Sequence, residues 1–372
     1  MGYNDGKGLI PKSPWFWRQS MEIAYEIKEG EAIVWRCYEY GTEAELPGTI
    51  EGRPVTELAP YVFSAHMDEK LLEQKIREGK IRMTYDAGGE ERAGRPGEER
   101  TGLPPALKGT EITAVSLPPE LRKIGAYAFY NCSRLRKISF YGSLSDLGAG
   151  LFTGCHAIRE LKLTLDETYV SCLREILMEV PEKLTVTLKG RVRGRLVFPE
   201  FFEESVENTP ARILVTQMHG SGMNFRNCFY DRKFDFKAYD ACFYMAKAGE
   251  DFDTVLEMVL SRLMYPVQLS SKGRQAYEDW LFCRLDRAME KAVLDRDMET
   301  LEYLAACTLK GQEADTEGRK EKNREDTLRK AASFAASHHF PEGTSFLMSE
   351  LYQVSGAETE EKRERKKERF AL

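Results

Sequence analysis

The chain has 372 residues, of which 42% are hydrophobic and 31% are charged, and this balance suits a globular protein of two or three domains. Lys and Arg number 54 against 60 Asp and Glu, and the resulting net charge of -6 disfavours a generally basic nucleic-acid binder. No run of about 18 apolar residues occurs, so we expect no membrane-spanning helix.

The N-terminal residues lack the pattern of a secretion signal. Such a signal needs a basic start followed by an apolar stretch, whereas the aromatic segment 15–17 is only three residues long. The eight Cys form no C-x-x-C pair, and no Cys and His group has the spacing of zinc ligands. We therefore expect a cytoplasmic protein with reduced thiols, without a metal or another cofactor.

A repeat with a period of 23 residues runs through the N-terminal half. The apolar pattern of Ile112, Val115 and Leu117 recurs as Leu135, Ile138, Phe140 and then as Ile158, Leu161, Leu163. At the same offset Ile124 corresponds to Leu147, Gly125 to Gly148, Ala126 to Ala149, Phe129 to Phe152, and Cys132 to Cys155. One coil of this length cannot bury its own apolar edge, so we expect successive coils to stack, with Phe129 beside Phe152. Cys132 and Cys155 then fill an inner ladder as small buried thiols, which we favour over a redox pair or a metal site.

Two segments resemble a known family. The strings IGAYAFYNCSRL at 124–135 and LGAGLFTGC at 147–155 follow the pattern I-G-x-x-A-F-x-x-C-x-x-L of BspA-type leucine-rich repeats, a bacterial class. Residues 46–63 resemble the family's first-repeat form. The resemblance covers residues 31–163 apart from an interruption, and it implies a short curved solenoid of the kind that binding or surface proteins use. The chain departs from the family in having few, broken repeats and no export signal.

The interruption and the segment after the repeats have mixed character. Within 64–110, residues 68–80 have helical spacing, whereas 87–102 are almost without apolar residues and predict a mobile loop. After the repeats the pattern predicts a helix over 167–180 that Pro181 ends. Strands are predicted at 184–188, 195–198 and 212–216. We expect this segment to cap the open edge of the repeats.

Two parts of this segment have alternative interpretations. Residues 189–195 contain four cations, of which Arg191, Arg193 and Arg195 are a minor candidate for nucleic acid; a hairpin turn with solvated charges is favoured. The loop His219-Gly220-Ser221-Gly222 presents backbone N–H groups to an anion, and with Arg226 it is a candidate anion-binding site. Its His219 with Ser221 or Cys228 also fits a base and a nucleophile, although no G-x-S-x-G motif is present.

From residue 236 the apolar spacing becomes helical. It predicts helices over 238–247, 252–265 and 275–295. Six apolar positions recur at an offset of 43: Leu285/Leu328, Ala288/Ala331, Ala292/Ala335, Val293/Ala336, Tyr303/Phe346 and Leu304/Leu347. These hairpins resemble an ankyrin-like array, although the T-P-L-H signature is missing and a polar insertion, 310–326, separates the units. The adjacent His338 and His339 point in different directions on a helix and do not predict a metal site.

Together these patterns predict an α+β chain, in which a short leucine-rich-repeat solenoid precedes an all-α domain of hairpin-like repeats. The expected parts are an N-terminal cap (1–30), repeats with the mobile insertion (31–163, insertion 64–110), a transitional α/β cap (164–235), a helical domain (236–356) and a charged tail (357–372). Extended repeat surfaces are suited to binding macromolecules, so we expect a non-catalytic scaffold with a protein partner, and nucleic acid and membrane are not the expected partners. The expected contact residues point outward between the buried repeat positions: Arg136, Lys137, Arg159, Glu160 and Lys162. The alternative is an anion-binding protein or enzyme centred on the loop of His219, Ser221 and Arg226.

Overall fold

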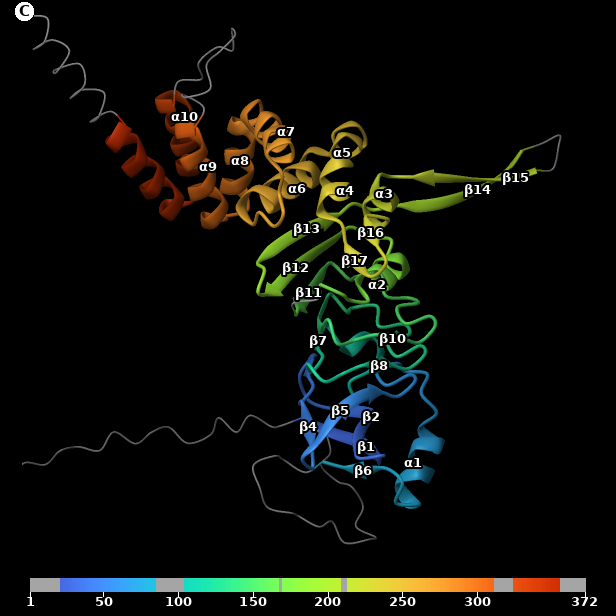
Figure 1. Ribbon diagram of the computed structural model, residues 1–372. Helices are drawn as coiled ribbons and strands as arrows, with labels where there is room; N and C mark the ends of the chain where they lie inside the picture. The colour runs from blue at the N-terminus through green and yellow to red at the C-terminus, as the bar shows by residue number, and fades with distance from the viewer. Residues whose placement is uncertain (1–20, 85–103, 167–168, 209–212, 311–323, 355–372) are drawn as a thin grey trace, which may run out of the picture. The chain divides into compact units, whose positions relative to one another are not determined.

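A computed structural model describes residues 21–84, 104–166, 169–208, 213–310 and 324–354 of the chain (Figure 1). Strands dominate the N-terminal part and helices the C-terminal part, as the α+β prediction requires. The chain packs as two compact units, Met1–Ile158 and Arg159–Leu372. The boundary between the units falls inside the segment in which the sequence predicts repeats.

The first unit contains two sets of paired strands. One sheet has the order β10-β8-β5-β2-β1-β6, with β4 beside β5. Its strands are β1 (Glu22–Lys28), β2 (Glu31–Tyr38), β4 (Thr49–Ile50), β5 (Arg53–Leu58), β6 (Arg82–Met83), β8 (Lys123–Ile124) and β10 (Asp146–Leu147). The second set pairs β3 (Glu43–Glu45), β7 (Ala114–Ser116) and β9 (Lys137–Tyr141) in parallel. The coils of β7 and β9 therefore each supply a longer strand to the second set and a two-residue strand, β8 or β10, to the first sheet.

Aromatic rings stack between successive coils of the first unit, as the 23-residue period predicts. The ring centroids of Phe129 and Phe152 lie 5.5 Å apart, with an angle of 12° between the planes. Phe63 of the upstream copy stacks on the other side of Phe129 at 5.2 Å. The backbone N–H groups of Phe63 and Phe129 also donate to carbonyls of the following coil, at Ala128 and Leu151. Each coil thus covers the apolar edge of its neighbour.

The repeat cysteines are buried, as predicted. The thiol of Cys132 donates to the carbonyl of Phe63, and the thiol of Cys155 donates to the carbonyl of Phe129. Both residues are at most 3% exposed. A side-chain hydrogen bond with Cys155, together with burial, raises the pKa of Cys132. The pair therefore serves as a neutral ladder that links successive coils.

Part of the predicted mobile insertion has regular structure. Helix α1 (Glu69–Arg77) lies inside the predicted helix 68–80, and the side chain of Asp68 caps it by accepting from the N–H of Leu71. Leu72 anchors the helix in a small apolar cluster with Met67 and Ile81. Strand β6 then pairs with β1. The predicted loop 87–102 lies outside the described residues.

The second unit opens with three paired strands. Strand β11 (Glu160–Leu165) is parallel to β12 (Leu184–Gly190), which forms an antiparallel hairpin with β13 (Gly194–Phe198). The predicted strands 184–188 and 195–198 are confirmed, and residues 189–195 contain the favoured hairpin turn. Helix α2 (Leu173–Glu179) ends before Pro181 as predicted, but it begins later than the predicted residue 167.

An antiparallel ribbon of two strands follows β13. It pairs β14 (Phe202–Asn208) with β15 (Ile213–His219), and β14 was not predicted. The predicted strand 212–216 corresponds to the first part of β15. Short elements lead from the ribbon to the helices: α3 (Gly222–Arg226), β16 (Phe229–Tyr230) and β17 (Lys233–Phe234).

The remainder of the second unit is helical, as predicted. Its helices are α4 (Phe236–Ala241), α5 (Phe243–Gly249), α6 (Phe252–Met264), α7 (Ser271–Phe282), α8 (Leu285–Leu294), α9 (Met298–Lys310), α10 (Arg324–Ser337) and a last helix over 341–354. Two helix predictions are corrected: 238–247 is broken at Cys242, and 275–295 is broken at residues 283–284. None of the described helices is long and apolar enough to cross a membrane.

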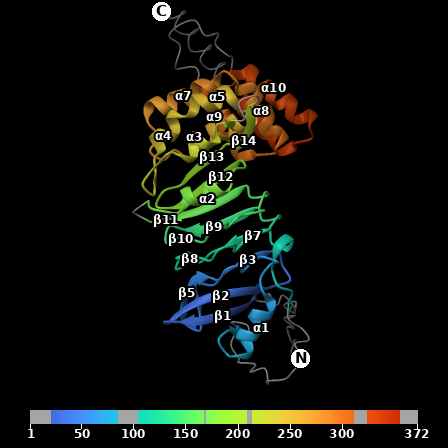
Figure 2. The same ribbon diagram turned by 90° about the vertical axis from the view of Figure 1, so that its right-hand side faces the viewer.

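The hairpin α8–α9 and the hairpin of α10 with the last helix turn in the same way. Arg296 and His339, which are 43 residues apart, both have a φ of 54°. The N–H of Arg296 bonds to the carbonyl of Val293, and the N–H of His339 bonds to the carbonyl of Ala336. The 43-residue offset in the sequence therefore corresponds to equal turn geometry, and α10 packs beside α8 and α9 (Figure 2).

Candidate functional site

Strand β9 of the first unit separates buried apolar residues from exposed charged ones. Leu135, Ile138 and Phe140 are at most 1% exposed, because they fill the interior of the coil. Arg136, just before the strand, is exposed and Lys137 is half-buried. The predicted outward direction of these two cations is therefore observed.

Neighbouring strands continue this outer surface. Lys137 lies opposite Ala114 of β7, which in turn lies opposite Glu43 of β3. Glu43 and Glu45 are both exposed on β3. The outer side of these strands thus has acidic residues at β3 and cations at β9.

The same alternation holds for β11 in the second unit. Ile158, Leu161 and Leu163 are fully buried, while Arg159 and Glu160 are exposed. Lys162 is half-buried and lies opposite Thr187 of β12. Arg159, Glu160 and Lys162 therefore lie on the outer side, as predicted.

Helix α6 limits the solvent-exposed part of the outer side of these strands. The hydroxyl of Thr185 on β12 donates to the Glu257 carboxylate of α6 at 2.6 Å. Lys183 makes an ion pair of 2.8 Å with the same carboxylate. The helix thus lies against β13 and the start of β12, so the candidate surface of this unit is centred on β11.

The residues of the 219–222 loop have separate partners. Nε2 of His219 lies 3.0 Å from a carboxylate oxygen of Glu204, across the β14–β15 ribbon, and the imidazole stacks on Phe202. Ser221 donates both its backbone N–H and its hydroxyl to the carboxylate of Glu250. Ser221 therefore pairs with Glu250, whereas His219 contacts Glu204 and Phe202 of the β14–β15 ribbon.

The loop already holds an acidic group of its own chain. A Gly-Ser-Gly loop is predicted to present N–H groups to an anion, and the N–H of Ser221 does so with the Glu250 carboxylate at 2.9 Å. The N–H of Gly222 points to the carbonyl of Glu200. These donors are thus occupied within the protein.

Arg226 is buried and surrounded by main-chain carbonyls. Its side chain donates to the carbonyl oxygens of five residues: Leu177, Pro199, Val180, Pro181 and Glu182. Burial lowers its pKa to about 10, so the guanidinium is charged at neutral pH. Its position ties the end of α2 to the segment that directly follows β13, because Pro199 lies in that segment and the other carbonyls lie in or just after α2.

Cys228, the other candidate nucleophile, is 4% exposed. Its thiol donates to the carbonyl of Asn224, and its sulfur lies 3.9 Å from that of Cys242. Burial is the main reason why its pKa is raised. A thiolate is the reactive form of cysteine, so this environment disfavours nucleophilic chemistry.

Metal ligands do not gather in the parts of the chain that the structure describes, where no group of three or more His, Cys, Asp and Glu is placed to hold an ion. The basic turn 189–195 has Arg195 stacked on the ring of Tyr265, with 5.1 Å between the guanidinium carbon and the ring centroid.

The sequence did not predict Glu250, Glu204 or Glu257 as partners of these residues, since each lies far along the chain from the residue that it contacts.

Comparison with known proteins identifies the repeats. Residues 105–176 match the family described as BspA type Leucine rich repeat region (6 copies). This part of the chain is therefore similar to BspA-type leucine-rich repeats. The predicted repeat region, 31–163, begins earlier and ends sooner than the matched residues. The first-repeat form predicted at 46–63 lies outside the match, although Phe63 stacks on the leucine-rich repeats through Phe129.

Among solved structures, a crystal structure of the T. pallidum Leucine Rich Repeat protein is similar at 17% sequence identity. The likeness covers 44% of this chain and 78% of that chain, with a TM-score of 0.21. No curated protein matches the chain.

Proposed function

We propose that the protein is a non-catalytic scaffold that binds another protein through the outer side of its leucine-rich-repeat strands. The contact residues are Arg136 and Lys137 in the first unit, and Arg159, Glu160 and Lys162 in the second. Leucine-rich repeats generally mediate protein–protein interaction, and this supports the assignment of the function class.

The observation that carries the proposal is the alternation along β9 and β11. Residues that face the coil interior are buried, whereas Arg136 and Lys137 by β9, and Arg159, Glu160 and Lys162 by β11, are charged and exposed or half-buried. Charged side chains at such positions add nothing to the core. Because both signs of charge occur, the surface favours a partner with a complementary polar surface over a uniformly charged polymer.

The test is affinity capture of partners from the cells that make the protein. The intact chain is compared with two charge-reversed variants, R136E/K137E and R159E/E160K/K162E. Matched controls reverse exposed cations of helices, K70E/R77E on α1 and K272E on α7. Reversal of complementary charges weakens association. We therefore expect at least one strand variant to capture about tenfold less of a partner, or less still, than the intact chain does.

The result that contradicts the proposal is equally direct. If both strand variants retain every partner of the intact chain, the outer side of the strands is not the binding surface. If the helix controls lose the same partners, the effect is one of general charge rather than of this surface.

An anion-binding or catalytic role of the 219–222 loop is the alternative function. The donors that such a site needs are already engaged, because Ser221 donates to Glu250 and Arg226 donates to main-chain carbonyls. These contacts make the loop a weaker candidate than the scaffold surface. Its test is binding of inorganic phosphate to the intact chain and to S221A. Saturable binding that S221A abolishes would favour the alternative over the scaffold.

A further inference from the structure

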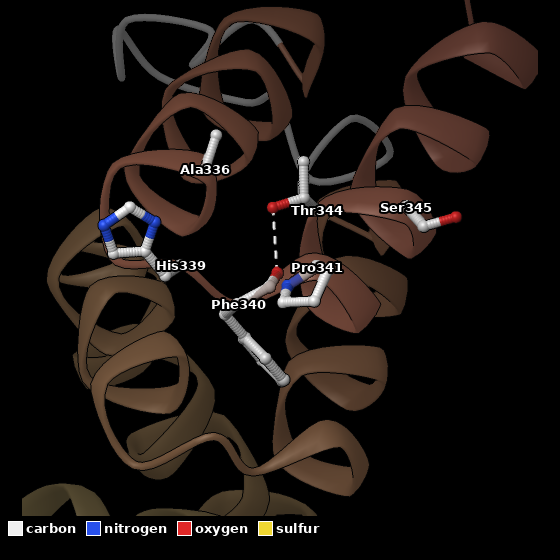
Figure 3. A pocket seen from close by; sticks show the side chains of 6 residues that line it. All are labelled: Ala336, His339, Phe340, Pro341, Thr344 and Ser345. Carbon is white, nitrogen blue, oxygen red and sulfur yellow. Dashed lines mark hydrogen bonds between the residues drawn. The ribbon is translucent and has the colours of Figure 1, made fainter.

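The hollow at the turn of the last helical hairpin offers little chemistry. It is an open cavity of about 620 Å³ where α10 meets the helix 341–354. Figure 3 shows the residues that line it: Ala336, His339, Phe340, Pro341, Thr344 and Ser345. The Thr344 hydroxyl donates to the carbonyl of Phe340 at 2.9 Å, and the six lining side chains include neither a thiol nor a carboxylate. A more reactive arrangement lies elsewhere in the second unit, at two cysteines.

Cys228 and Cys242 bring two sulfur atoms close together. Their Sγ atoms lie 3.9 Å apart, although the residues are 14 positions apart in the sequence. Both residues belong to the second compact unit. The S–S bond of a disulfide is about 2.05 Å long, so a further approach of about 2 Å would join the two sulfurs.

The main chain holds both cysteines in place. Cys228 comes shortly after α3, and its carbonyl accepts from the N–H of Asp235 at 2.9 Å. Cys242 lies at the break between α4 and α5, where it ends one helix and begins the next. Its N–H donates to the carbonyl of Ala238. The two sulfurs therefore meet while the segment between them keeps its folded structure.

The two thiols differ in their access to solvent. Cys228 is 4% exposed, and its thiol donates to the carbonyl of Asn224. Burial raises the pKa of Cys228, so little of it is thiolate, the reactive form. Cys242 is half-buried and thus partly open to solvent. A dissolved oxidant is therefore expected to react first with Cys242.

The repeat cysteines show what is different about this pair. Cys132 and Cys155 are at most 3% exposed, and each thiol donates to a main-chain carbonyl. An oxidant has no such access to either of them. At Cys228 and Cys242, by contrast, a neighbouring sulfur and a route to solvent occur together.

We propose that Cys228 and Cys242 form a reversible disulfide when the protein meets hydrogen peroxide. The sulfur of Cys242 attacks one peroxide oxygen, the O–O bond breaks, and the products are a sulfenic acid and one water. The sulfur of Cys228 then attacks the sulfur of Cys242. The S–O bond breaks, and the hydroxyl leaves as a second water with the proton of the Cys228 thiol. Two thiols thus lose two electrons, and the peroxide gains them.

Peptide mapping of the folded full chain after peroxide treatment tests the proposal. Trypsin cleaves after Lys and Arg, so Cys228 lies in the peptide 227–232 and Cys242 in the peptide 238–247. After alkylation of the remaining thiols, we expect these two peptides to be joined, with the loss of two hydrogens. The linked peptide is expected to be about tenfold more abundant than without peroxide, and dithiothreitol is expected to separate it.

Three variants serve as controls. C228S and C242S are expected to lose the linked peptide. In C228S the reaction is expected to stop at the sulfenic acid of Cys242, which dimedone traps. C283S removes an exposed cysteine between α7 and α8, and it is expected to keep the linked peptide.

Two results would overturn this disulfide. One is the absence of the linked peptide in a sample where Cys283, in the peptide 275–284, has been oxidised, because the oxidant has then acted on an exposed thiol but not on this pair. The other is a linked peptide that forms only after the chain is unfolded in urea, because the folded contact then does not direct the bond.

Discussion

Three arginines among the described residues have no exposed surface, and each makes several hydrogen bonds to groups that are distant in the sequence or buried. Arg36 donates to the carbonyls of Val62 and Ser64 and pairs with Glu69. Arg262 makes two hydrogen bonds of 2.8 Å to the Asp240 carboxylate. The guanidinium has five donors in a planar arrangement, so one side chain satisfies several buried acceptors that would otherwise be costly.

Arg226 differs from the other two because its hydrogen-bond partners among the described residues are all main-chain carbonyls. Replacing it in R226L leaves these acceptors buried without a donor, so we expect the free energy of unfolding to fall by about 3 kcal/mol or more. Urea unfolding measures this loss. The matched variant R193L, in the exposed turn after β12, is expected to change stability by less than about 0.5 kcal/mol. Equal stability of R226L and R193L would contradict a structural role for Arg226.

The sequence alone did not predict that Arg226 binds buried main-chain carbonyls. In the sequence, its neighbours Ser221 and Gly222 indicate an anion-binding loop as one alternative, not a structural role for Arg226. The acceptors that hold it come from residues as far as 49 positions earlier, at Leu177. Local spacing does not report such contacts, because the fold alone brings these carbonyls together.

At the scale of elements, close approach between coils explains the repeated glycines. An ideal Cβ on Gly148 would lie 2.2 Å from the backbone nitrogen of Ala126, and one on Gly125 would lie 2.4 Å from that of Pro60. Real Cβ atoms do not reach such distances, so each glycine lets its coil lie directly on the previous one. The offset of 23 residues that the sequence shows is thus a packing requirement.

Substitution of Gly148 tests this packing. G148A is expected to lower the free energy of unfolding by about 2 kcal/mol or more, because the neighbouring atom is backbone and does not move aside. Thermal or urea unfolding provides the measurement. Gly249, at the end of α5, has no atom within 4 Å of its ideal Cβ, so the control G249A is expected to stay within about 0.5 kcal/mol of the intact chain. A G148A variant as stable as G249A would show that the coils are not in close contact there.

Elements with one buried side were predicted well, and the others were not. Strand β12 alternates between buried and half-buried residues, so its period of two was visible in the sequence. Strand β14 was missed because its described residues 202–205 are all exposed, and a period needs a buried side. The break between α7 and α8 was missed because neither Cys283 nor Arg284 is a helix breaker. Packing of α7 on α6, and of α8 on α9 and α10, requires this break.

At the scale of the whole molecule, the proposed contact residues lie in both compact units: Arg136 and Lys137 in the first, and Arg159, Glu160 and Lys162 in the second. The 23-residue pattern continues across residue 158, so the sequence offered no sign that the two compact units divide there. The family resemblance indicated the repeats, whereas the division into units emerged only from the structure.

Stacked coils are the central claim, since only coils that cover one another direct Arg136 and Lys137 outward. The most direct measurement is a double-mutant cycle on Phe129 and Phe152 by urea unfolding. Each change to Ala removes a large buried side chain and is expected to cost about 3 kcal/mol or more. If the rings stack, the double variant loses about 1 kcal/mol less than the sum of the single losses. Losses that add within about 0.3 kcal/mol would contradict the stacking and the surface that depends on it.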